Sequence, residues 1–138
     1  PEPPKFSKVP NLFGMDKNVA MFTLAFNQLE PGTISYRKTG RGQPGTVVEQ
    51  SPRVGSSVKY RTPVNIVLEQ GVRVPNVIGL GEEEAVNRLN QEGLIGHISR
   101  QTTGKGEIGT IVEQNPSAGT SVRIKSAVAL VIEIEDWS

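Results

Sequence analysis

The sequence contains no cysteine and a single histidine, His97. Disulfides, thiolate zinc sites, cysteine nucleophiles and multi-histidine metal centres are therefore excluded. His97 has no serine, carboxylate or second histidine at a recognisable catalytic spacing, so we expect it on the surface or in an edge strand. The sequence shows no recognisable combination of a catalytic acid, base, nucleophile or metal ligand. We therefore expect neither enzymatic activity nor a cofactor.

Aromatic side chains and long apolar runs are also scarce. Aromatic residues make up 5% of the 138 residues and hydrophobic residues 36%, which favours two small aliphatic cores over one large core. The longest uninterrupted apolar stretch, residues 127–132, is far shorter than the roughly 18–20 residues of a membrane-spanning helix. No leader pattern follows Pro1, so we expect a piece of a longer protein without its own targeting or transmembrane segment.

Net charge is nearly absent, at +1 for the whole chain. This value argues against a binder of nucleic acid and against a strongly basic membrane-surface protein. The charge is nevertheless uneven: residues 1–70 hold nine Lys and Arg against five acids, and residues 71–138 hold six against nine. Two interpretations stay open for the first half, namely ordinary solvated charge or a surface for an anionic partner.

An internal repeat is the strongest positive signal. Residues 9–14 match residues 74–79 at an offset of 65, and residues 45–58 match residues 109–122 at an offset of 64. One residue is lost between the two blocks. Two such matches in the same order predict two tandem copies of one small module.

Each copy is predicted to be an α+β module with one helix packed on a three-stranded β-sheet. Residues 17–28 and 82–92 show helical apolar spacing; Asp16 is the expected N-cap of the first helix, and Gly93 is the expected stop of the second. The expected strands are 33–38, 45–50 and 63–69 in the first copy, and 95–101, 110–114 and 127–134 in the second.

The predicted domain organisation is a Pro-rich linker at 1–8, a first module at 9–70 and a second module at 71–138. The linker is expected to be extended and semi-rigid. Only residues 70–73 are left over between the two repeat blocks, which is too short for free tumbling. We therefore expect the two modules to form an extended, stiff rod.

The motif order resembles the PASTA family, named after penicillin-binding proteins and serine/threonine kinases. A Val-Pro-Asn-x-x-Gly opening, a helix, a Gly-Thr-(Val/Ile)-Val-Glu-Gln-x-Pro-x-x-Gly block and a final aliphatic strand occur twice, between residues 9 and 134. The resemblance implies tandem extracytoplasmic modules of a membrane-anchored bacterial kinase or penicillin-binding protein. It also implies that these modules bind peptidoglycan fragments or their precursors.

The first helix departs from the polar surface that is usual in this family. Three apolar residues form one stripe there, where the second copy has Glu84, Asn87 and Gln91; the three are Val19, Phe22 and Phe26. At 100° per residue this stripe lies away from the apolar face that carries Ala20 and Leu24. Two interpretations are open: a loop or the segment around Phe6 covers the stripe, or the stripe is an interface to another module, a second copy or the upstream enzyme domain.

Two loops, residues 40–45 and 104–109, match G-x-G-x-x-G. Nucleotide binding is not expected, because neither loop leads from a strand into a helix and no kinase motifs accompany them. We expect mobile hairpins whose glycines adopt positive φ angles, with weak capture of an anion by loop amides and Arg41 or Lys105 as the alternative.

The candidate ligand-binding residues combine a basic group with two strand carboxylates that recur in both copies. They are Arg37, Lys38, Arg41, Glu49, Arg100, Lys105 and Glu113. For Glu49 and Glu113, ordinary solvated strand positions are the alternative interpretation. Trp137 is expected to pack on the sheet, with stacking on a sugar ring as its alternative.

The functional hypothesis is a non-catalytic peptidoglycan-binding sensor outside the cytoplasm. Recognition is expected to be shallow and weak for each module, with avidity added by the tandem arrangement. The alternative is a structural spacer or docking module that positions or regulates its upstream enzyme without binding a ligand.

Overall fold

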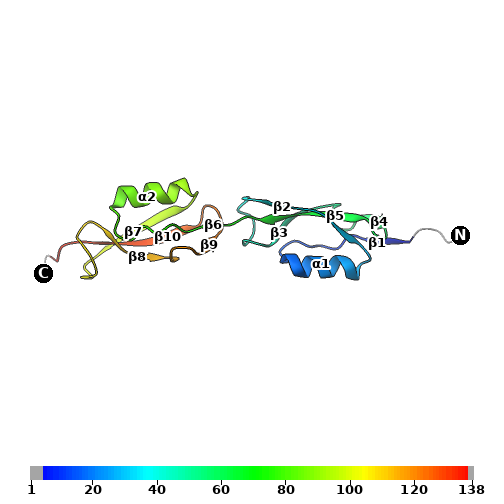
Figure 1. The fold of residues 1–138 in the computed structure, drawn as a ribbon, viewed down its shortest axis with the longest axis horizontal. Coiled ribbons are helices and arrows are strands. Elements are labelled where there is room, and N and C mark those ends of the chain that lie inside the picture. The colour runs from blue at the N-terminus through cyan, green and yellow to red at the C-terminus, as the bar shows by residue number, and fades with distance from the viewer. Residues whose placement is uncertain (1–4, 137–138) are drawn as a thin grey trace. The chain divides into compact units, whose positions relative to one another are not determined.

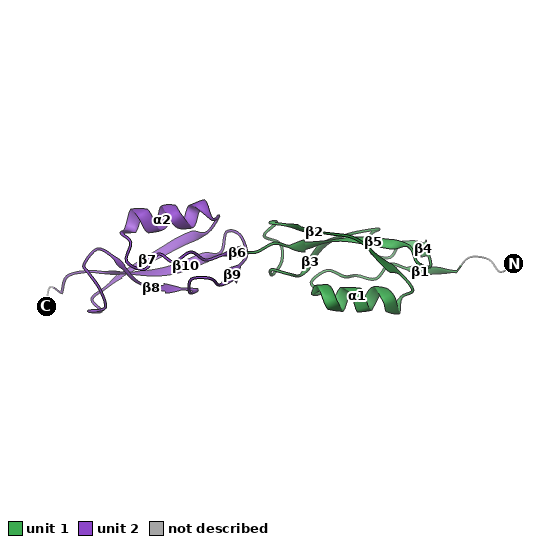
Figure 2. Cartoon of the chain, in the orientation of Figure 1, with its two compact units in different colours: residues 1–71 green, residues 72–138 purple. Residues whose placement is uncertain are grey.

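A computed structural model describes residues 5–136 and divides the chain into two compact units, Pro1–Gly71 and Val72–Ser138 (Figures 1 and 2). Each unit contains one helix, a mixed three-stranded sheet and a small two-stranded sheet. The predicted fold class, two tandem α+β modules with a helix on a three-stranded sheet, is confirmed.

Unit 1 has six elements. They are β1 (Phe6–Lys8), α1 (Lys17–Phe26), β2 (Glu30–Arg37), β3 (Val47–Ser51), β4 (Ser57–Lys59) and β5 (Pro63–Glu69). Unit 2 repeats the order with β6 (Val72–Arg73), α2 (Glu82–Gln91), β7 (Ile95–Gln101), β8 (Ile111–Asn115), β9 (Ser121–Val122) and β10 (Ala127–Glu133).

The last strand of each unit is the centre of its main sheet. The strand order is β2-β5-β3 in unit 1 and β7-β10-β8 in unit 2. β5 runs parallel to β2 and antiparallel to β3, and β10 has the same relation to β7 and β8. The two edge strands of each sheet therefore meet only through the final strand.

The two helices begin differently, and the first begins at the predicted N-cap, Asp16. The Asp16 carboxylate accepts a hydrogen bond from the Val19 backbone N–H at 2.9 Å, so Asp16 caps α1. Gly81 at the start of α2 offers no side chain. The first turn of α2 instead carries Glu82, Glu83 and Glu84, whose negative charge is favourable at the positive end of the helix dipole.

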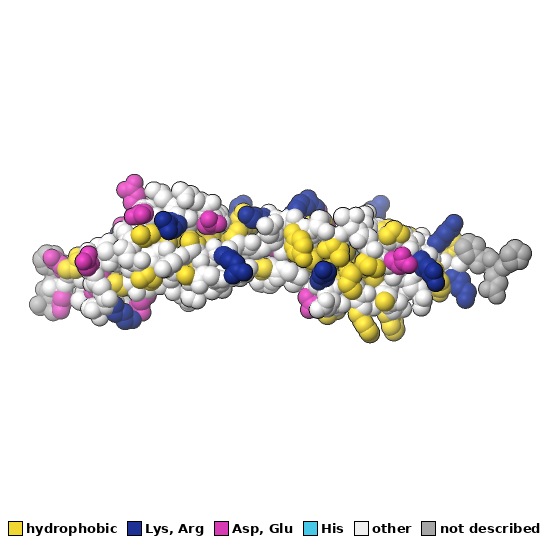
Figure 3. Space-filling view, in the orientation of Figure 1, with side chains coloured by type: hydrophobic (Ala, Val, Ile, Leu, Met, Phe, Trp, Pro, Cys, Tyr) yellow, Lys and Arg dark blue, Asp and Glu magenta, His cyan; other side chains and the backbone are white. Residues whose placement is uncertain are grey.

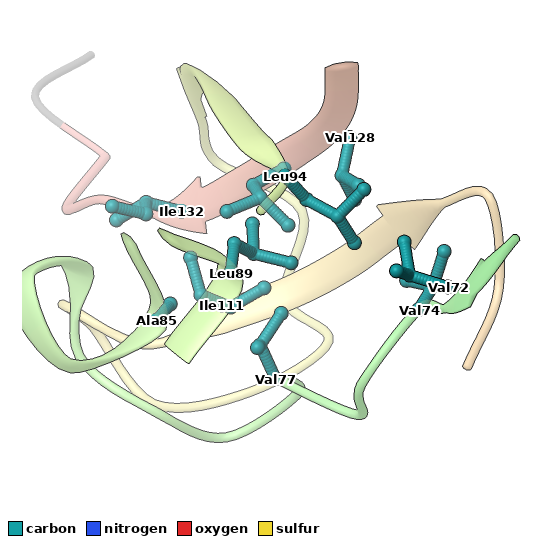
Figure 4. Packing of buried hydrophobic residues seen from close by; sticks show 10 residues of the cluster. Val72, Val74, Val77, Ala85, Leu89, Leu94, Ile111, Val128 and Ile132 are labelled. Carbon is teal, nitrogen blue, oxygen red and sulfur yellow. The ribbon is translucent and has the colours of Figure 1, made fainter. Parts of the chain in front are cut away.

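Each unit has its own aliphatic core between helix and sheet. Alternate residues of β5 point toward the helix and are buried, namely Val64, Ile66 and Leu68. Figure 4 shows the equivalent core of unit 2, where side chains from β6, α2, β8 and β10 and from the segments before α2 and β7 surround Leu89. Burial of these aliphatic side chains is the main favourable contribution to folding.

The segment predicted as a linker belongs in part to unit 1. Residues 6–8 form β1 and pair antiparallel with β4, with Ser7 opposite Val58. Val58 packs against the core of unit 1, so this segment is anchored and the linker prediction is wrong for it. Residues 1–4 of the predicted linker, and Trp137, lie outside the described residues.

Between residues 5 and 136, neither helix has the length and hydropathy required to cross a lipid bilayer.

Candidate functional site

The face of the β2-β5-β3 sheet that points away from α1 carries a shallow polar groove. Ser35 and Glu49 are register partners of Val67 on either side of β5, so their side chains share this face. The groove has a volume of about 510 Å³. Its lining residues are Thr33, Ser35, Arg37, Glu49, Gln50, Ser51, Asn65, Ile66 and Val67. We call it the open-face groove.

Two arginines meet one carboxylate at the end of this groove. Arg37 at the end of β2 forms an ion pair with Glu49 on β3. Arg41 in the loop that follows β2 reaches the other oxygen of the same carboxylate, with 3.2 Å between Nη2 and Oε1. The two arginine side chains are more than half exposed and the Glu49 side chain about a third, so solvent screens the pairs and a ligand can approach the guanidinium groups.

Unit 2 repeats half of this arrangement. The Lys105 ammonium donates to the Glu113 carboxylate at 2.5 Å, in the positions that Arg41 and Glu49 occupy in unit 1. The residue equivalent to Arg37 is Gln101, opposite Glu133 on β10. Arg37 therefore has no charged counterpart in unit 2.

Two of the candidate residues are not brought into these clusters. Arg100 is the register partner of the core residue Ile132, so it points toward the helix side of its sheet. There it donates to both carboxylate oxygens of Glu82 at 2.9 Å. Lys38 is exposed and forms no ion pair within the described part of the chain. A ligand-binding function for the seven candidate residues stays a prediction.

A buried carboxylate anchors the first glycine-rich loop. Glu69, at the end of β5, has 1% of its surface exposed. It accepts hydrogen bonds from the backbone N–H groups of Thr39 and Gly40, both at 2.9 Å, and from the Thr39 hydroxyl. Burial alone raises the pKa of Glu69, but the Thr39 hydroxyl and the loop amides prevail and hold this pKa below its ordinary value of 4.5.

Unit 2 contains the same anchor. Glu133 accepts from the backbone N–H groups of Thr103 and Gly104 at 2.7 and 3.0 Å, and from the Thr103 hydroxyl. These hydrogen bonds, chiefly the one from the Thr103 hydroxyl, lower the pKa of Glu133. Both carboxylates are thus held as buried anions, and each fixes the loop that carries Arg41 or Lys105.

The hairpin prediction for the two G-x-G-x-x-G loops is wrong. The first loop joins β2 to β3, which lie on opposite sides of β5, so the loop crosses over the sheet end. Its outer glycines, Gly40 and Gly45, do have positive φ angles, as predicted. The amides of Thr39 and Gly40 already bind an internal anion, the Glu69 carboxylate, which contradicts the interpretation of these amides as a capture site.

The apolar stripe on α1 is uncovered. Phe22 and Phe26 are 73% and 76% exposed, and Val19 is 47% exposed. The expectation that a loop or the segment around Phe6 covers them is therefore wrong. Figure 3 shows hydrophobic side chains gathered along the surface of α1. An interface function for this stripe stays a prediction.

His97 is exposed on β7, an edge strand, as predicted. Across residues 5–136, no group of three or more His, Asp or Glu side chains is arranged to hold a metal ion.

The burial of the two anchors is not predicted from the sequence, because a glutamate at the end of a strand is most often solvated. The repeat contains a signal for them. Glu69 and Glu133 are separated by 64 residues, and the Thr-Gly pairs that bind them, at 39–40 and 103–104, show the same offset. A polar pair and an acid that recur together mark a mutual contact.

The sequence matches the profile of the PASTA domain twice, over residues 7–70 and 72–133. It is 28% identical over 131 residues to the probable serine/threonine-protein kinase PknB of Corynebacterium glutamicum, covering 91% of this chain and 20% of that protein. It is 27% identical over 139 residues to the serine/threonine-protein kinase PrkC of Bacillus subtilis, covering 95% of this chain and 21% of that protein. The chain thus spans about a fifth of the length of these curated relatives.

The fold is similar to solved structures of the extra-cellular and PASTA regions of serine/threonine kinases. One is the entire extra-cellular region of the Ser/Thr kinase PrkC from Staphylococcus aureus, with a TM-score of 0.57 and 27% identity, covering 91% of this chain and 46% of that chain. Another is the three-PASTA-domain of a Ser/Thr kinase from Staphylococcus aureus, with a TM-score of 0.52 and 17% identity, covering 94% and 66%. A kinase domain is not part of this chain, because both matched segments are the non-catalytic module. With each of its two units matched to the same profile and folded in the same way, the chain belongs to the PASTA domain family.

Proposed function

We propose that this chain is a ligand-sensing region of a bacterial serine/threonine kinase, located outside the cytoplasm, and that its open-face groove binds peptidoglycan fragments. The kinase parent is supported by the relatives named above, which are serine/threonine kinases. The extracytoplasmic location is supported by the similarity to the extra-cellular region of a kinase from Staphylococcus aureus.

The convergence of Arg37 and Arg41 on one carboxylate carries the proposal. Two guanidinium groups share the single negative charge of Glu49, so the cluster retains one positive charge. A carboxylate of a stem peptide can pair with either arginine in bidentate geometry. The Glu49 carboxylate in turn accepts a hydrogen bond from a ligand amine.

The rest of the groove suits an amide-rich and hydroxyl-rich ligand. Thr33, Ser35 and Ser51 supply hydroxyl groups, and Asn65 supplies an amide. These groups lie on a shallow surface and remain in contact with water, so each contact contributes little to the binding free energy. Recognition by many weak contacts fits a sensor of abundant, polymeric ligands, for which several modules act together.

The test is an NMR titration of the intact chain with purified muropeptides. We expect backbone amide shifts in β2, β3 and β5 at millimolar ligand, and weaker affinity for Arg37→Gln, which installs the residue that unit 2 has at Gln101. Arg53→Gln, an exposed arginine outside the groove, is the matched control and should bind as the parent chain does. An unchanged spectrum at millimolar ligand, or shifts confined to unit 2, would contradict the proposal and favour the spacer alternative.

A further inference from the structure

We propose that one end of unit 1 binds the surface of an anionic lipid membrane, independently of the open-face groove. This end combines exposed cations and exposed aromatic side chains from three segments. Three of its members lie in β1 or just before it: Lys5, Phe6 and Lys8. Three lie at the end of β4 and in the turn that follows: Lys59, Tyr60 and Arg61. The last two, Phe22 and Phe26, lie on α1. We call it the basic–aromatic end.

The register of the small β1-β4 sheet places cations and an aromatic ring on one face. Phe6 is opposite Lys59, and Lys8 is opposite Ser57. Since Val58 between them packs into the core, the side chains of Phe6, Lys8 and Lys59 all point outward. Phe6 is 54% exposed on this face.

The end of α1 lies against the same turn. The backbone N–H of Arg61 donates to the carbonyl of Gln28 at 2.7 Å, and Gln28 is two residues beyond Phe26. The backbone N–H of Tyr60 donates to the carbonyl of Lys5 at 2.9 Å. Backbone hydrogen bonds of the turn at residues 60–61 therefore connect the end of α1, which carries Phe22 and Phe26, to the strands β1 and β4, which carry the cations.

The cations of this end are unneutralised. Lys5, Lys8, Lys59 and Arg61 form no ion pair within residues 5–136. One acid, Glu30, lies close to this end, since its backbone N–H donates to the carbonyl of Thr62 at 3.2 Å. Figure 3 shows Lys and Arg side chains over the part of unit 1 that contains β1 and β4. The net charge of +1 for the whole chain conceals this local excess.

This combination matches the chemistry of an anionic lipid surface better than that of other partners. Each cation near such a surface contributes about 1 kcal/mol, and aromatic rings insert at the level of the headgroups. A soluble polyanion would be bound by the cations alone and would leave Phe22 and Phe26 in water. Three or four exposed apolar side chains are also too few for the roughly 800 Å² that each partner of a stable protein complex buries.

Unit 2 provides an internal comparison, because it keeps three of the four cations and lacks the aromatic rings. Lys8, Lys59 and Arg61 correspond to Arg73, Arg123 and Lys125. Arg61 and Lys125 even share a positive φ, at 67° and 71°. The four aromatic positions correspond to residues without rings, namely Gly71, Asn87, Gln91 and Ile124. Basic side chains at this place are thus common to both units, and the ring-bearing surface is specific to unit 1.

The experiment is co-sedimentation of the intact chain with vesicles of phosphatidylcholine that contain about 30% phosphatidylglycerol, at about 0.1 M salt. We expect binding that is lost in pure phosphatidylcholine and weakened at about 1 M salt. Lys8→Gln with Lys59→Gln should lower the partition coefficient about 30-fold. Phe22→Asn with Phe26→Gln, which installs the residues of unit 2, should lower it at least about tenfold. Arg123→Gln with Lys125→Gln is the matched control and should change it less than either variant.

Four results would overturn the proposal. The first two are no binding to the anionic vesicles and equal binding to neutral vesicles. The third is binding that depends on Arg123 and Lys125 but not on the basic–aromatic end. The fourth is binding of polyphosphate that is as strong as vesicle binding and is unaffected by the phenylalanine variant. Self-association that disappears in the phenylalanine variant, measured by analytical ultracentrifugation without lipid, would assign the stripe to a protein partner instead. Circular dichroism of each variant verifies folding, and the muropeptide titration, which reports on the groove, is scored separately.

Discussion

Glu69 accepts two hydrogen bonds from one residue, Thr39: one from its backbone N–H, at 2.9 Å, and one from its hydroxyl group. The two residues lie thirty positions apart along the chain, at the end of β5 and just beyond β2. A carboxylate with 1% exposure thereby links the central strand to the crossover loop. Glu133 and Thr103 repeat the relationship in unit 2.

Removal of this anchor should destabilise unit 1. Glu69→Ala leaves the loop amides and the Thr39 hydroxyl without their acceptor, so we expect a loss of about 1–3 kcal/mol in the free energy of unfolding. Chemical denaturation of the intact chain measures it. Glu49→Ala in the same sheet removes a solvent-exposed ion-pair partner and should cost at most about 1 kcal/mol. Equal losses for the two variants would show that the buried hydrogen bonds have no special role.

The same anchors predict acid sensitivity. Both carboxyl groups have a lower pKa in the folded chain than their ordinary 4.5, so the unfolded chain takes up protons first as the pH falls. Their stabilisation is therefore complete above about pH 4.5 and is lost as the pH falls through the lowered folded pKa. Thermal melts between neutral pH and about pH 3 measure this loss. Glu69→Gln with Glu133→Gln should melt lower at neutral pH and show a shallower decline toward acid; an unchanged acid slope would rule out these groups as its source.

The two helix N-termini predict opposite effects of substitution. Asp16→Ala removes the hydrogen bond to the Val19 amide and should destabilise unit 1 by about 1 kcal/mol. Gly81→Ser supplies the missing cap to α2 and should stabilise unit 2 by a few tenths of a kcal/mol, because a Cβ at Gly81 meets no atom within 4 Å. Denaturation monitored by circular dichroism measures both. A gain from Asp16→Ala would contradict the observed cap.

The separate cores predict separate unfolding transitions. Leu24 and Leu89 are fully buried in cores that share no residue. Leu24→Ala should lower the stability of unit 1 by about 2–5 kcal/mol and leave unit 2 unchanged, and Leu89→Ala should do the reverse. Amide hydrogen exchange resolves the two units within one sample. Loss of protection in both units after either substitution would show that they unfold as one.

The repeat and the apolar spacing predict most of the secondary structure. The strands expected at 63–69 and 95–101 have those bounds in the structure. In the first of them the alternating apolar residues Val64, Ile66 and Leu68 face the core. The small β1-β4 sheet is not predicted, since a three-residue strand has little pattern and its partner lies about fifty residues away. The crossover is missed for a related reason: a loop sequence does not reveal whether the strands it joins are neighbours.

The candidate site is predicted in part. Arg37, Arg41 and Glu49 meet as one cluster because β2 and β3 both pair with β5, but Arg100 faces the opposite side of its sheet. A shift of one residue along a strand changes the face, and the repeat offset places Gln101, not Arg100, opposite Glu133.

The rod-like arrangement expected from the short connection stays a prediction that small-angle X-ray scattering can check.

The position of β5 and β10 has a consequence for biosynthesis. Because the central strand is the last one of its unit to be translated, β2 and β3 have no backbone partner while the ribosome is still adding residues 52–62. The three-stranded sheet of unit 1 therefore cannot form until the segment ending at Glu69, which also carries the buried carboxylate, has left the exit tunnel. A chain cut before the last strand of a unit cannot form the three-stranded sheet of that unit, whereas a chain cut after Glu69 contains all three strands of the first sheet.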